Sequence, residues 1–558
     1  MRAADGRGAG NLREIRKSLR VAGYRRGSGA RGPGGWALAI ALCGALALAG
    51  GAEAGRGASA GRAAAPGGAE SPAGAGTGAA ALDWERWRAG LESALAARGF
   101  RGASLSVLVV ERGSGALRFS RSPSRALVPA SAQKLLVALA ALDAFGPAHR
   151  FITQVRAPAP PDATGRVAAL FVRGGGDASL TSEQWWRLAA DLRALGVSHI
   201  EGDVLLDDSH FDGERWLPDW QPVSARAYHA PVGALSANYG AFRVVAAPGP
   251  APGAPAVVRV DPPIPYLRVE NAARTVRRGA RSGVTVSRRA GAGFERVMVG
   301  GSVALGDEPK QVWRSVGNPL GYAGAVLRWQ LEANGIRVAG RVRRGAAPAS
   351  AALLLDFEGF PLRRSVELAL KYSNNMMTEA LLKSLAVAGA PGEAAGAQGA
   401  SGNARGNVPG AQGNWEQGLR ALRARLMALG VPLQGARLRD GSGLSRKNRV
   451  SAQTLVAVLR AADARFGIGP ELLAALPMAA SDGTLRERAL AASQRLRAKT
   501  GSLEGVSALA GFARIAPGAG ESGGRDVVFA ILANGFRNGD LEAARAMDRF
   551  AEALAGAR

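Results

Sequence analysis

The chain has 558 residues, 47% of them hydrophobic, so it is long enough for several domains and can bury a sizeable core. Its formal net charge of +27 raises the question of a nucleic-acid partner. We exclude that partner because 64 of the 71 basic residues are Arg in a chain rich in Ala and Gly, which indicates a coding bias, and because no basic run is interleaved with aromatic residues. A basic surface still suits an anionic polymer.

Cysteine and histidine usage argues against disulfide and metal chemistry. The only cysteine, Cys43, lies in the N-terminal leader, so the rest of the chain has no disulfide and no thiolate metal site. The four histidines show no ligand spacing and are interpreted as ordinary surface or core residues: His149, His199, His210 and His229. We therefore expect no disulfide and no metal site built from cysteine or histidine.

The first 81 residues are interpreted as targeting and linker sequence. A basic, polar segment precedes an apolar run of 14 residues, 36–49, and small residues follow it. Residues 1–49 are predicted to be a signal peptide, because the run is too short to span a membrane comfortably. The alternative is an uncleaved anchor that keeps the protein at the membrane, and both imply export. Residues 50–81 are nearly all Ala, Gly, Pro and Ser, which predicts a flexible linker.

Folded sequence is predicted to begin near residue 82. A helix is expected over 84–98, and a pair of strands over 104–110 and 116–120. Pro129 cannot lie in a helix interior, and the Ala- and Leu-rich run after it predicts a helix that starts near Ser131.

Residues 151–355 are rich in short strands and turns. They are predicted to form one or two inserted β-rich accessory domains without an acid/base cluster of their own. Two helices interrupt the strands, near 183–195 and 320–334. The predicted strands are 151–155, 167–172, 204–207, 256–260, 284–287 and 296–303.

Beyond the accessory region the chain becomes helical again. A helix is predicted over 365–386, and the Gly/Ala/Asn-rich residues 387–414 after it are predicted to be a disordered insertion. The other predicted elements are helices over 415–430, 451–465 and 540–555, a loop over 438–446, and strands over 506–515 and 526–533.

Ser131 and Lys134 are the first candidate pair for chemistry. Lys134 is the only lysine of the chain with a serine three residues before it, and residues three apart lie on one helix face. A serine hydroxyl is a poor nucleophile unless a neighbouring group takes its proton. Lysine can do this only as the free amine, so its ordinary pKa of about 10.4 must be lowered by burial or by a nearby cation.

Lys499 is the candidate for that second cation, in a Lys-Thr-Gly-Ser run on a predicted edge strand. It would lower the pKa of Lys134 and hold an anionic group of the substrate. Gly501 would let a substrate backbone approach closely. The N–H groups of Ser502 and Ser131 would form an oxyanion hole.

Ser373 and Asn375 complete the set, as a hydroxyl that relays protons and an amide that holds a substrate carbonyl. Ser-x-Asn also occurs at Ser236 and Ser401, but the first falls in the accessory region and the second in the predicted insertion. Each pattern alone is a weak or moderate indicator. All three in this order, each in fitting local structure, indicate a Ser/Lys acyl-enzyme site.

The three patterns, Ser131-Ala-Gln-Lys134, Ser373-Asn-Asn375 and Lys499-Thr-Gly-Ser502, resemble the motifs of penicillin-recognising serine D,D-peptidases. The very long separation of the first two is typical of class C low-molecular-mass penicillin-binding proteins, the D-alanyl-D-alanine carboxypeptidase/endopeptidase group (penicillin-binding protein 4 type). The resemblance covers roughly residue 82 to the C-terminus. Four further stretches resemble that group: 202–209, 230–236, 440–446 and 482–485.

The resemblance implies an α+β fold, an antiparallel sheet flanked by helices as in β-lactamases. Residues 82–150 and 356–558 would form this transpeptidase-like domain, with the accessory domains inserted between its two parts. The resemblance also implies that Ser131 attacks a D-Ala carbonyl with Lys134 as base, and that Ser373 passes the proton to the leaving amine.

It implies further that Lys499 and Thr500 hold the terminal carboxylate and that water hydrolyses the acyl-enzyme without a metal or cofactor. The implied substrates are peptidoglycan stem peptides and cross-links, the implied inhibitors are β-lactam antibiotics, and the implied location is the periplasm. Arg446 is a candidate for binding the side-chain carboxylate of diaminopimelate; the alternative is an ordinary surface arginine in a loop.

The sequence departs from the family at one place. Members often carry an acidic residue before the Ala-Pro segment, and residues 221–226 have none, which leaves open how the substrate amino group is recognised. Two other functions remain as alternatives, a β-lactamase-like hydrolase and a non-catalytic penicillin-binding wall scaffold. The long accessory region argues against the first, and the complete motif set argues against the second.

Overall fold

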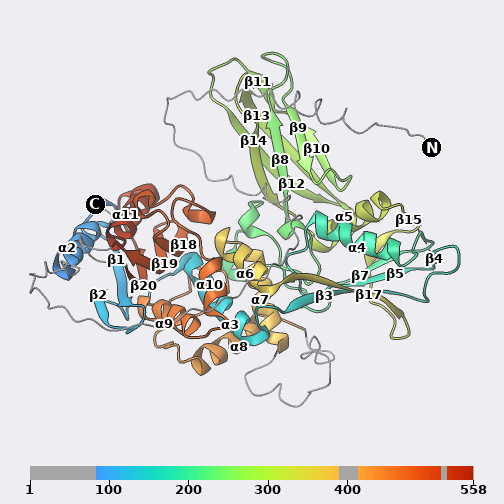
Figure 1. The fold of residues 1–558 in the computed structure, drawn as a ribbon. Coiled ribbons are helices and arrows are strands. Elements are labelled where there is room, and N and C mark those ends of the chain that lie inside the picture. The colour runs from blue at the N-terminus through green and yellow to red at the C-terminus, as the bar shows by residue number, and fades with distance from the viewer. Residues whose placement is uncertain (1–82, 389–411, 517–523, 557–558) are drawn as a thin grey trace, which may run out of the picture. The chain divides into compact units, whose positions relative to one another are not determined.

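The computed structural model describes residues 83–388, 412–516 and 524–556 (Figure 1). The predicted leader and linker, 1–49 and 50–81, lie outside this part of the chain. So does most of the insertion predicted over 387–414. The described ends of that insertion are ordered, since residues 387–388 finish a helix and Gly413 accepts a hydrogen bond from the Asp212 backbone.

A five-stranded antiparallel sheet joins the two ends of the described chain, in the order β18-β19-β20-β1-β2. Its N-terminal strands, blue in Figure 1, pair with the red C-terminal strands through β1 and β20. The four strands predicted for this sheet are all present, and the fifth is the edge strand predicted for Lys499. The strands are β1 (Ser104–Glu111), β2 (Leu117–Arg121), β18 (Leu496–Leu503), β19 (Val506–Ile515) and β20 (Arg525–Asn534).

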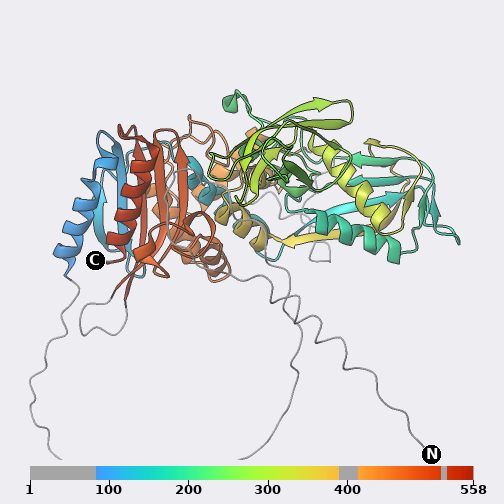
Figure 2. The same ribbon diagram turned by 90° about the horizontal axis from the view of Figure 1, so that it is seen from above.

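Both faces of the middle of this sheet are buried, because alternate side chains of β1, β19 and β20 enter different cores. In β20, Phe529 and Ile531 pack on the helices α2 (Trp84–Leu95) and α11 (Gly539–Leu554), which cover one face (Figure 2). Ala530 of the same strand faces the opposite core. The sheet therefore forms the middle layer between two groups of helices.

The helices on the second face surround α3 (Lys134–Phe145). Every residue of α3 from Lys134 to Leu142 is buried, so this helix is the centre of the core rather than an amphipathic surface helix. The surrounding helices are α6 (Leu362–Lys371), α7 (Asn375–Ala388), α8 (Trp415–Ala428), α9 (Ala452–Asp463) and α10 (Gly469–Ala475).

The single helix predicted over 365–386 is wrong in one respect. The structure has two helices, α6 and α7, with a break at residues 372–374. Ser373 takes a φ of +56°, in the left-handed region, which a continuous right-handed helix does not allow. The break lies at the second sequence motif and therefore has a direct bearing on the site.

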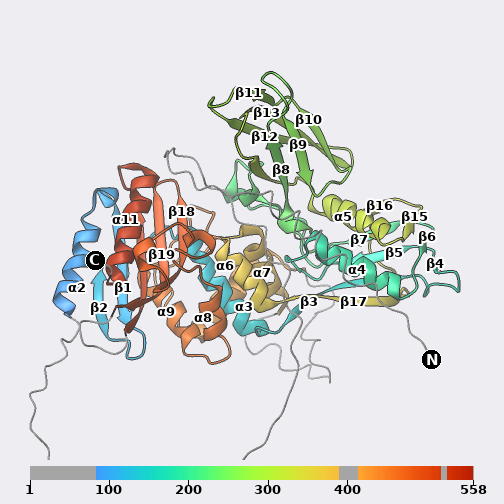
Figure 3. The same cartoon turned by 45° about the horizontal axis from the view of Figure 1, so that its top comes forward.

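Residues between α3 and α6 form further sheets and two covering helices. A mixed five-stranded sheet has the order β16-β7-β5-β3-β17, and the chain enters and leaves it through the antiparallel neighbours β3 (Arg150–Ala157) and β17 (Ala352–Pro361). The helices α4 (Ser182–Ala194) and α5 (Pro319–Ala333) pack beside this sheet (Figure 3). Its other strands are β5 (Leu170–Arg173), β7 (Val204–Asp207) and β16 (Val342–Arg344).

Three smaller sheets complete the accessory region, and several of their strands were absent from the predicted set. Their strand orders are β14-β8-β9, β10-β13-β11 with β12 on β13, and β15-β6-β4. The strands are β4 (Arg166–Val167), β6 (His199–Ile200), β8 (Ala241–Ala247), β9 (Val257–Asp261), β10 (Leu267–Asn271), β11 (Arg274–Val276), β12 (Gly283–Gly291), β13 (Phe294–Ala304), β14 (Lys310–Ser315) and β15 (Arg337–Val338).

One accessory segment, residues 208–240, returns to the helical layer. Its Trp220, Ala230 and Val232 belong to the same core as α3. This segment also reaches the second sequence motif, since the Tyr228 carbonyl accepts a hydrogen bond from the Asn375 amide. Among the described residues, no helix is long and apolar enough to cross a membrane.

Candidate active site

Ser131 and Lys134 lie at the start of the buried helix. A 3-10 turn, Ala130–Gln133, precedes α3, so the predicted helix start has a tighter first turn than an α-helix. Ala130 has a φ of +46°, which turns the chain sharply just before the serine. The Ser131 Oγ lies 2.9 Å from the Lys134 Nζ, as the three-residue spacing predicted.

The Lys134 amine is fully buried and has two further partners. It donates hydrogen bonds to the Asn375 Oδ1 and to the Ser442 carbonyl oxygen, each at 2.7 Å. Burial lowers the pKa of Lys134 to about 7, although the carboxylates of Glu379 and Asp440 oppose this shift. At a pH near 7, a large fraction of the Lys134 amine is therefore neutral.

Ser373 and Lys499 form a second pair in the same site. The Lys499 Nζ donates to the Ser373 Oγ at 3.0 Å and to the Thr500 carbonyl at 2.8 Å. Burial lowers the pKa of Lys499 well below its ordinary value, and the charge of Lys134 lowers it further. Asn375, which bonds to Lys134, follows Ser373 by two positions and so links this pair to the first one. The structure thus brings together the five residues predicted to be catalytic.

Asn375 has partners within the chain for both ends of its amide. Its Oδ1 accepts from Lys134, and its Nδ2 donates to the Tyr228 carbonyl at 2.9 Å. The amide was predicted to hold a substrate carbonyl. In the structure it contacts Lys134 and joins α7 to the accessory segment, and its hold on a substrate carbonyl stays a prediction.

The edge strand β18 lies directly against the turn that carries Ser131. A Cβ at Gly501 would be 2.6 Å from the Pro129 carbonyl oxygen. The glycine lets β18 approach the backbone of that turn, and its predicted role of admitting a substrate backbone stays a prediction. The Ala498 N–H bonds outward to the Pro477 carbonyl, so strand alternation also directs the Ser502 N–H away from β19.

Thr500 makes a hydrogen bond to the stretch 482–485, one of the four stretches that resemble the class C group. Its Oγ1 donates to the Thr484 Oγ1 at 2.7 Å. Asp482 of the same stretch accepts from the Lys371 Nζ at 2.5 Å, at the end of α6. The stretch therefore connects the second and third motifs.

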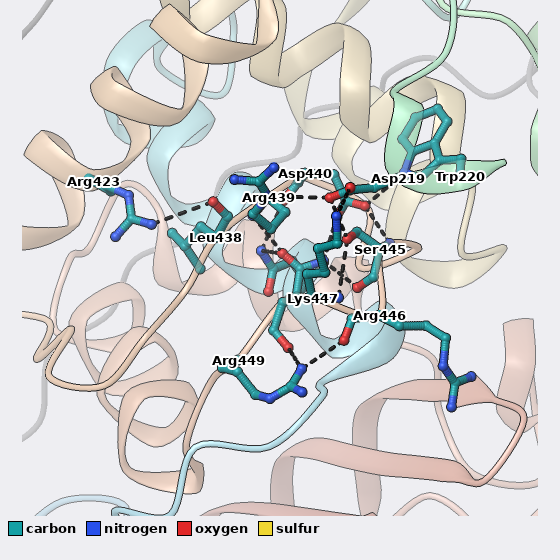
Figure 4. A network of polar contacts seen from close by, with 12 residues as sticks. Asp219, Trp220, Arg423, Leu438, Arg439, Asp440, Ser445, Arg446, Lys447 and Arg449 are labelled. Carbon is teal, nitrogen blue, oxygen red and sulfur yellow. Dashed lines mark hydrogen bonds and ion pairs between the residues drawn. The ribbon is translucent and has the colours of Figure 1, made fainter.

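Arg446 is exposed and points away from the cluster of polar contacts next to it (Figure 4). Its guanidinium donates to the Glu504 carbonyl at 2.9 Å, in the turn after β18. The cluster itself is centred on Asp219, whose carboxylate accepts from the Ser445 hydroxyl and the Lys447 amine at 3.1 and 2.5 Å. The Lys447 hydrogen bond is the main reason that the pKa of Asp219 is lowered.

Asp219 was not among the predicted site residues, because it lies two positions before the segment 221–226 in which the family often carries an acidic residue. Sequence reasoning also missed two buried carboxylates, Glu379 and Asp440, that organise the loop around Ser442. Asp440 accepts from the Trp220 Nε1 at 2.9 Å and from the Gly443 N–H at 2.7 Å. A glutamate four residues after Asn375, and so on the same helix face as that motif residue, was the available signal.

The arrangement suits one kind of chemistry. A hydroxyl faces a buried amine whose pKa is near neutrality, a second buried amine lies close by, and an edge strand offers an outward N–H group. Within the described ranges, no three His, Cys, Asp or Glu side chains are grouped as metal ligands would be. An antiparallel sheet flanked by helices with this site defines a serine hydrolase that works through an acyl-enzyme.

Comparison with known proteins gives the family. The D-Ala-D-Ala carboxypeptidase 3 (S13) family matches residues 87–555, and the chain belongs to that family. A D-alanyl-D-alanine carboxypeptidase of Actinomadura sp. (strain R39) is 34% identical over 455 residues, which cover 78% of each chain. D-alanyl-D-alanine carboxypeptidase DacB of Haemophilus influenzae is 27% identical over 431 residues, 75% of this chain and 82% of the relative.

The solved structures agree with this assignment. Penicillin binding protein 4 (dacB) from Haemophilus influenzae superposes with a TM-score of 0.67 at 25% identity, over 83% of this chain and 98% of its own. The predicted fold class, the resemblance to class C penicillin-binding proteins and the predicted serine-type D-Ala-D-Ala carboxypeptidase are thereby confirmed.

Proposed function

We propose that Ser131 is the nucleophile of a D,D-carboxypeptidase and Lys134 its general base. The observation that carries this proposal is the contact of 2.9 Å between the hydroxyl and a fully buried amine. The Ser131 Oγ bonds to the carbonyl carbon of the penultimate D-Ala while its proton passes to Lys134. The C–N bond then breaks, the proton reaches the leaving amine through Ser373, and water hydrolyses the ester to restore the hydroxyl.

Lys499 is proposed to orient the substrate. Lys499 is desolvated and close to the Ser373 hydroxyl, which supports a role in holding the terminal carboxylate together with Thr500. The outward N–H of Ser502 and the N–H of Ser131 would stabilise the oxyanion. Gly501 would admit the substrate backbone, and it also lets β18 approach the turn of Ser131.

Arg446 is proposed to bind the side-chain carboxylate of diaminopimelate. Its exposed guanidinium donates to the Glu504 carbonyl in the turn after β18. This turn follows Ser502 by two residues. Arg446→Gln should raise KM for a diaminopimelate pentapeptide and leave KM for the corresponding lysine peptide unchanged. An equal change for both peptides would show that Arg446 is an ordinary loop arginine.

The decisive experiment compares the wild type with Ser131→Ala. We expect fluorescent penicillin to label the wild type alone, and D-Ala to be released from a diaminopimelate pentapeptide by the wild type alone. No labelling of the wild type, or equal release of D-Ala by both, would contradict the proposal. A cross-linked muropeptide dimer in the same assay tests the D,D-endopeptidase activity, which needs only a larger leaving amine.

We also propose that the protein binds β-lactams. The similarity to penicillin binding protein 4 from Haemophilus influenzae and the Ser/Lys site support this proposal. The acyl-enzyme formed with penicillin should persist for minutes or longer. Rapid turnover of penicillin would favour the alternative of a β-lactamase-like hydrolase. Labelling without any D-Ala release would favour a penicillin-binding scaffold.

Export to the periplasm and action on peptidoglycan are proposed together. The leader predicted over 1–49 supports export, and a basic protein suits the anionic wall. We also propose that residues 82–150 and 356–558 form the transpeptidase-like domain and 151–355 the accessory domains. N-terminal sequencing of the mature protein tests the first point: a start near residue 50 is expected, and a retained leader would indicate a membrane anchor.

A further inference from the structure

We propose that Glu379, one helical turn after Asn375, is a positioning residue that orients the Lys134 amine through the Ser442 carbonyl. The proposal rests on the role of Lys134 as base. A neutral amine has two hydrogens and one lone pair. The Asn375 Oδ1 and the Ser442 carbonyl, both at 2.7 Å, accept the two hydrogens, so the lone pair is left directed at the Ser131 hydroxyl.

Each of these two acceptors must itself be fixed if it is to orient the amine. The Asn375 amide is held by its hydrogen bond to the Tyr228 carbonyl. The Ser442 carbonyl belongs to a loop without regular secondary structure, and such a loop needs partners for its own backbone groups. Glu379 and Asp440 each accept hydrogen bonds from two backbone N–H groups of this loop, and Glu379 holds the two that directly precede the Ser442 carbonyl.

The Glu379 carboxylate is fully buried and accepts hydrogen bonds on both oxygens. The Ser442 N–H donates to its Oε1 at 2.7 Å, and the Gly441 N–H lies 3.1 Å from each oxygen. The Trp415 Nε1 donates to Oε2 at 2.8 Å. Two successive peptide groups before the Ser442 carbonyl are therefore anchored to one side chain of α7.

Asp440 holds the next peptide group in the same way. The Gly443 N–H, in the same peptide plane as the Ser442 carbonyl, donates to the Asp440 Oδ1 at 2.7 Å. Asp440 thus fixes this peptide group through its N–H, and the carbonyl on the opposite side of the same group accepts the hydrogen bond from Lys134. Glu379 and Asn375 project from one face of α7, four residues apart, so one helix controls both acceptors.

Glu379 also acts on Lys134 through its charge. The charged groups around the two residues are Asp440 on the loop, Lys499 on β18, and Lys383 on α7, which is paired with Asp212. Burial and Asp440 raise the pKa of Glu379 to about 7, while hydrogen bonds from three donors favour the ionised form. The ionised carboxylate raises the pKa of Lys134, so its removal would lower that pKa.

Loss of the carboxylate should therefore have two separable effects. The maximal acylation rate should fall, because the lone pair is no longer directed at Ser131. The acidic limb of the pH–rate profile should move to lower pH, because Lys134 loses a proton more easily. Damage to the fold alone would lower the rate without moving the limb.

The test measures acylation by fluorescent penicillin between pH 5 and pH 9, with thermal melting as the control for folding. Glu379→Gln should lower the plateau about 10- to 100-fold and move the acidic limb to lower pH. Glu379→Asp keeps the charge but is one methylene too short, so it should lower the plateau with the limb unchanged. Glu416→Gln, on the exposed face of α8, is the matched control and should behave as the wild type.

A wild-type plateau in Glu379→Gln would overturn the proposal, and so would a lower plateau with an unmoved limb. If Glu379→Gln does not fold cooperatively, Glu379→Asp decides, and a wild-type plateau in that variant overturns the proposal. A wild type that is never labelled would instead refute the function proposed for Ser131 and Lys134, and this inference with it.

Discussion

The pH dependence of acylation is the most direct consequence of the site. Lys134 is proposed to act as a neutral amine, and burial lowers its pKa from 10.5 to about 7. Each pKa unit is worth about 1.36 kcal/mol, so the site disfavours the charged amine by roughly 5 kcal/mol relative to water. About half of Lys134 is then neutral at pH 7, against roughly one part in 3,000 for an ordinary lysine.

The acylation rate should follow this neutral fraction. We expect the second-order rate constant to rise about tenfold per pH unit below pH 6 and to level off above pH 8. The sign follows from the lowered pKa, because protonation removes the lone pair as the pH falls. At pH 7 the buried amine should give a rate roughly 1,000-fold above that of an unshifted lysine.

The assay is stopped-flow acylation by a fluorescent penicillin from pH 5 to pH 10. Two variants serve as controls. Ser131→Ala should not be labelled at any pH, and Lys134→Arg should lose at least about 1,000-fold throughout, because an arginine stays charged. A flat profile from pH 5 to pH 9, or a rise centred near pH 10, would refute the reasoning about Lys134.

Three further predictions concern stability. Gly501→Ala places a Cβ 2.6 Å from a backbone carbonyl, so it should cost about 1–3 kcal/mol in a urea melt and slow acylation; an unchanged melt would mean that β18 can move aside. Trp220→Phe leaves the buried Asp440 without one donor and should cost about 1–3 kcal/mol at pH 7, whereas an unchanged free energy of unfolding would show that this bond is dispensable. Burial raises the pKa of Asp177 from 3.8 to about 6, so the folded protein binds more protons between these values and loses roughly 3 kcal/mol as the pH rises through them. Asp177→Asn should remove this decline, and an identical pH dependence of unfolding in both proteins would contradict it.

Local patterns predicted most of the elements that carry the site. The strand predicted over 506–515 is β19 (Val506–Ile515) with the same bounds, because a nearly continuous run of small and apolar residues suits a strand that is buried on both faces. The spacing of Ser131 and Lys134 predicted their contact because it depends on three residues of one helix start. Local patterns failed at Ser373, where a left-handed residue breaks a run with good helix propensity.

The short accessory strands were harder to predict for the same physical reason. Strands such as β8 and β14 are stabilised mainly by each other, since their pairing joins residues about 70 positions apart. Nothing within either segment specifies that partner. The predicted set therefore contained some strands of the accessory region and omitted others.

The sequence by itself determined which residues have reactive side chains and that three motifs belong to one site. Only the tertiary structure decided how those side chains are made reactive. The neutral state of Lys134 depends on burial by the whole core, and the direction of its lone pair on two acceptors. Those acceptors are held by Tyr228, Glu379 and Asp440, which come from separate parts of the chain and meet only when it folds.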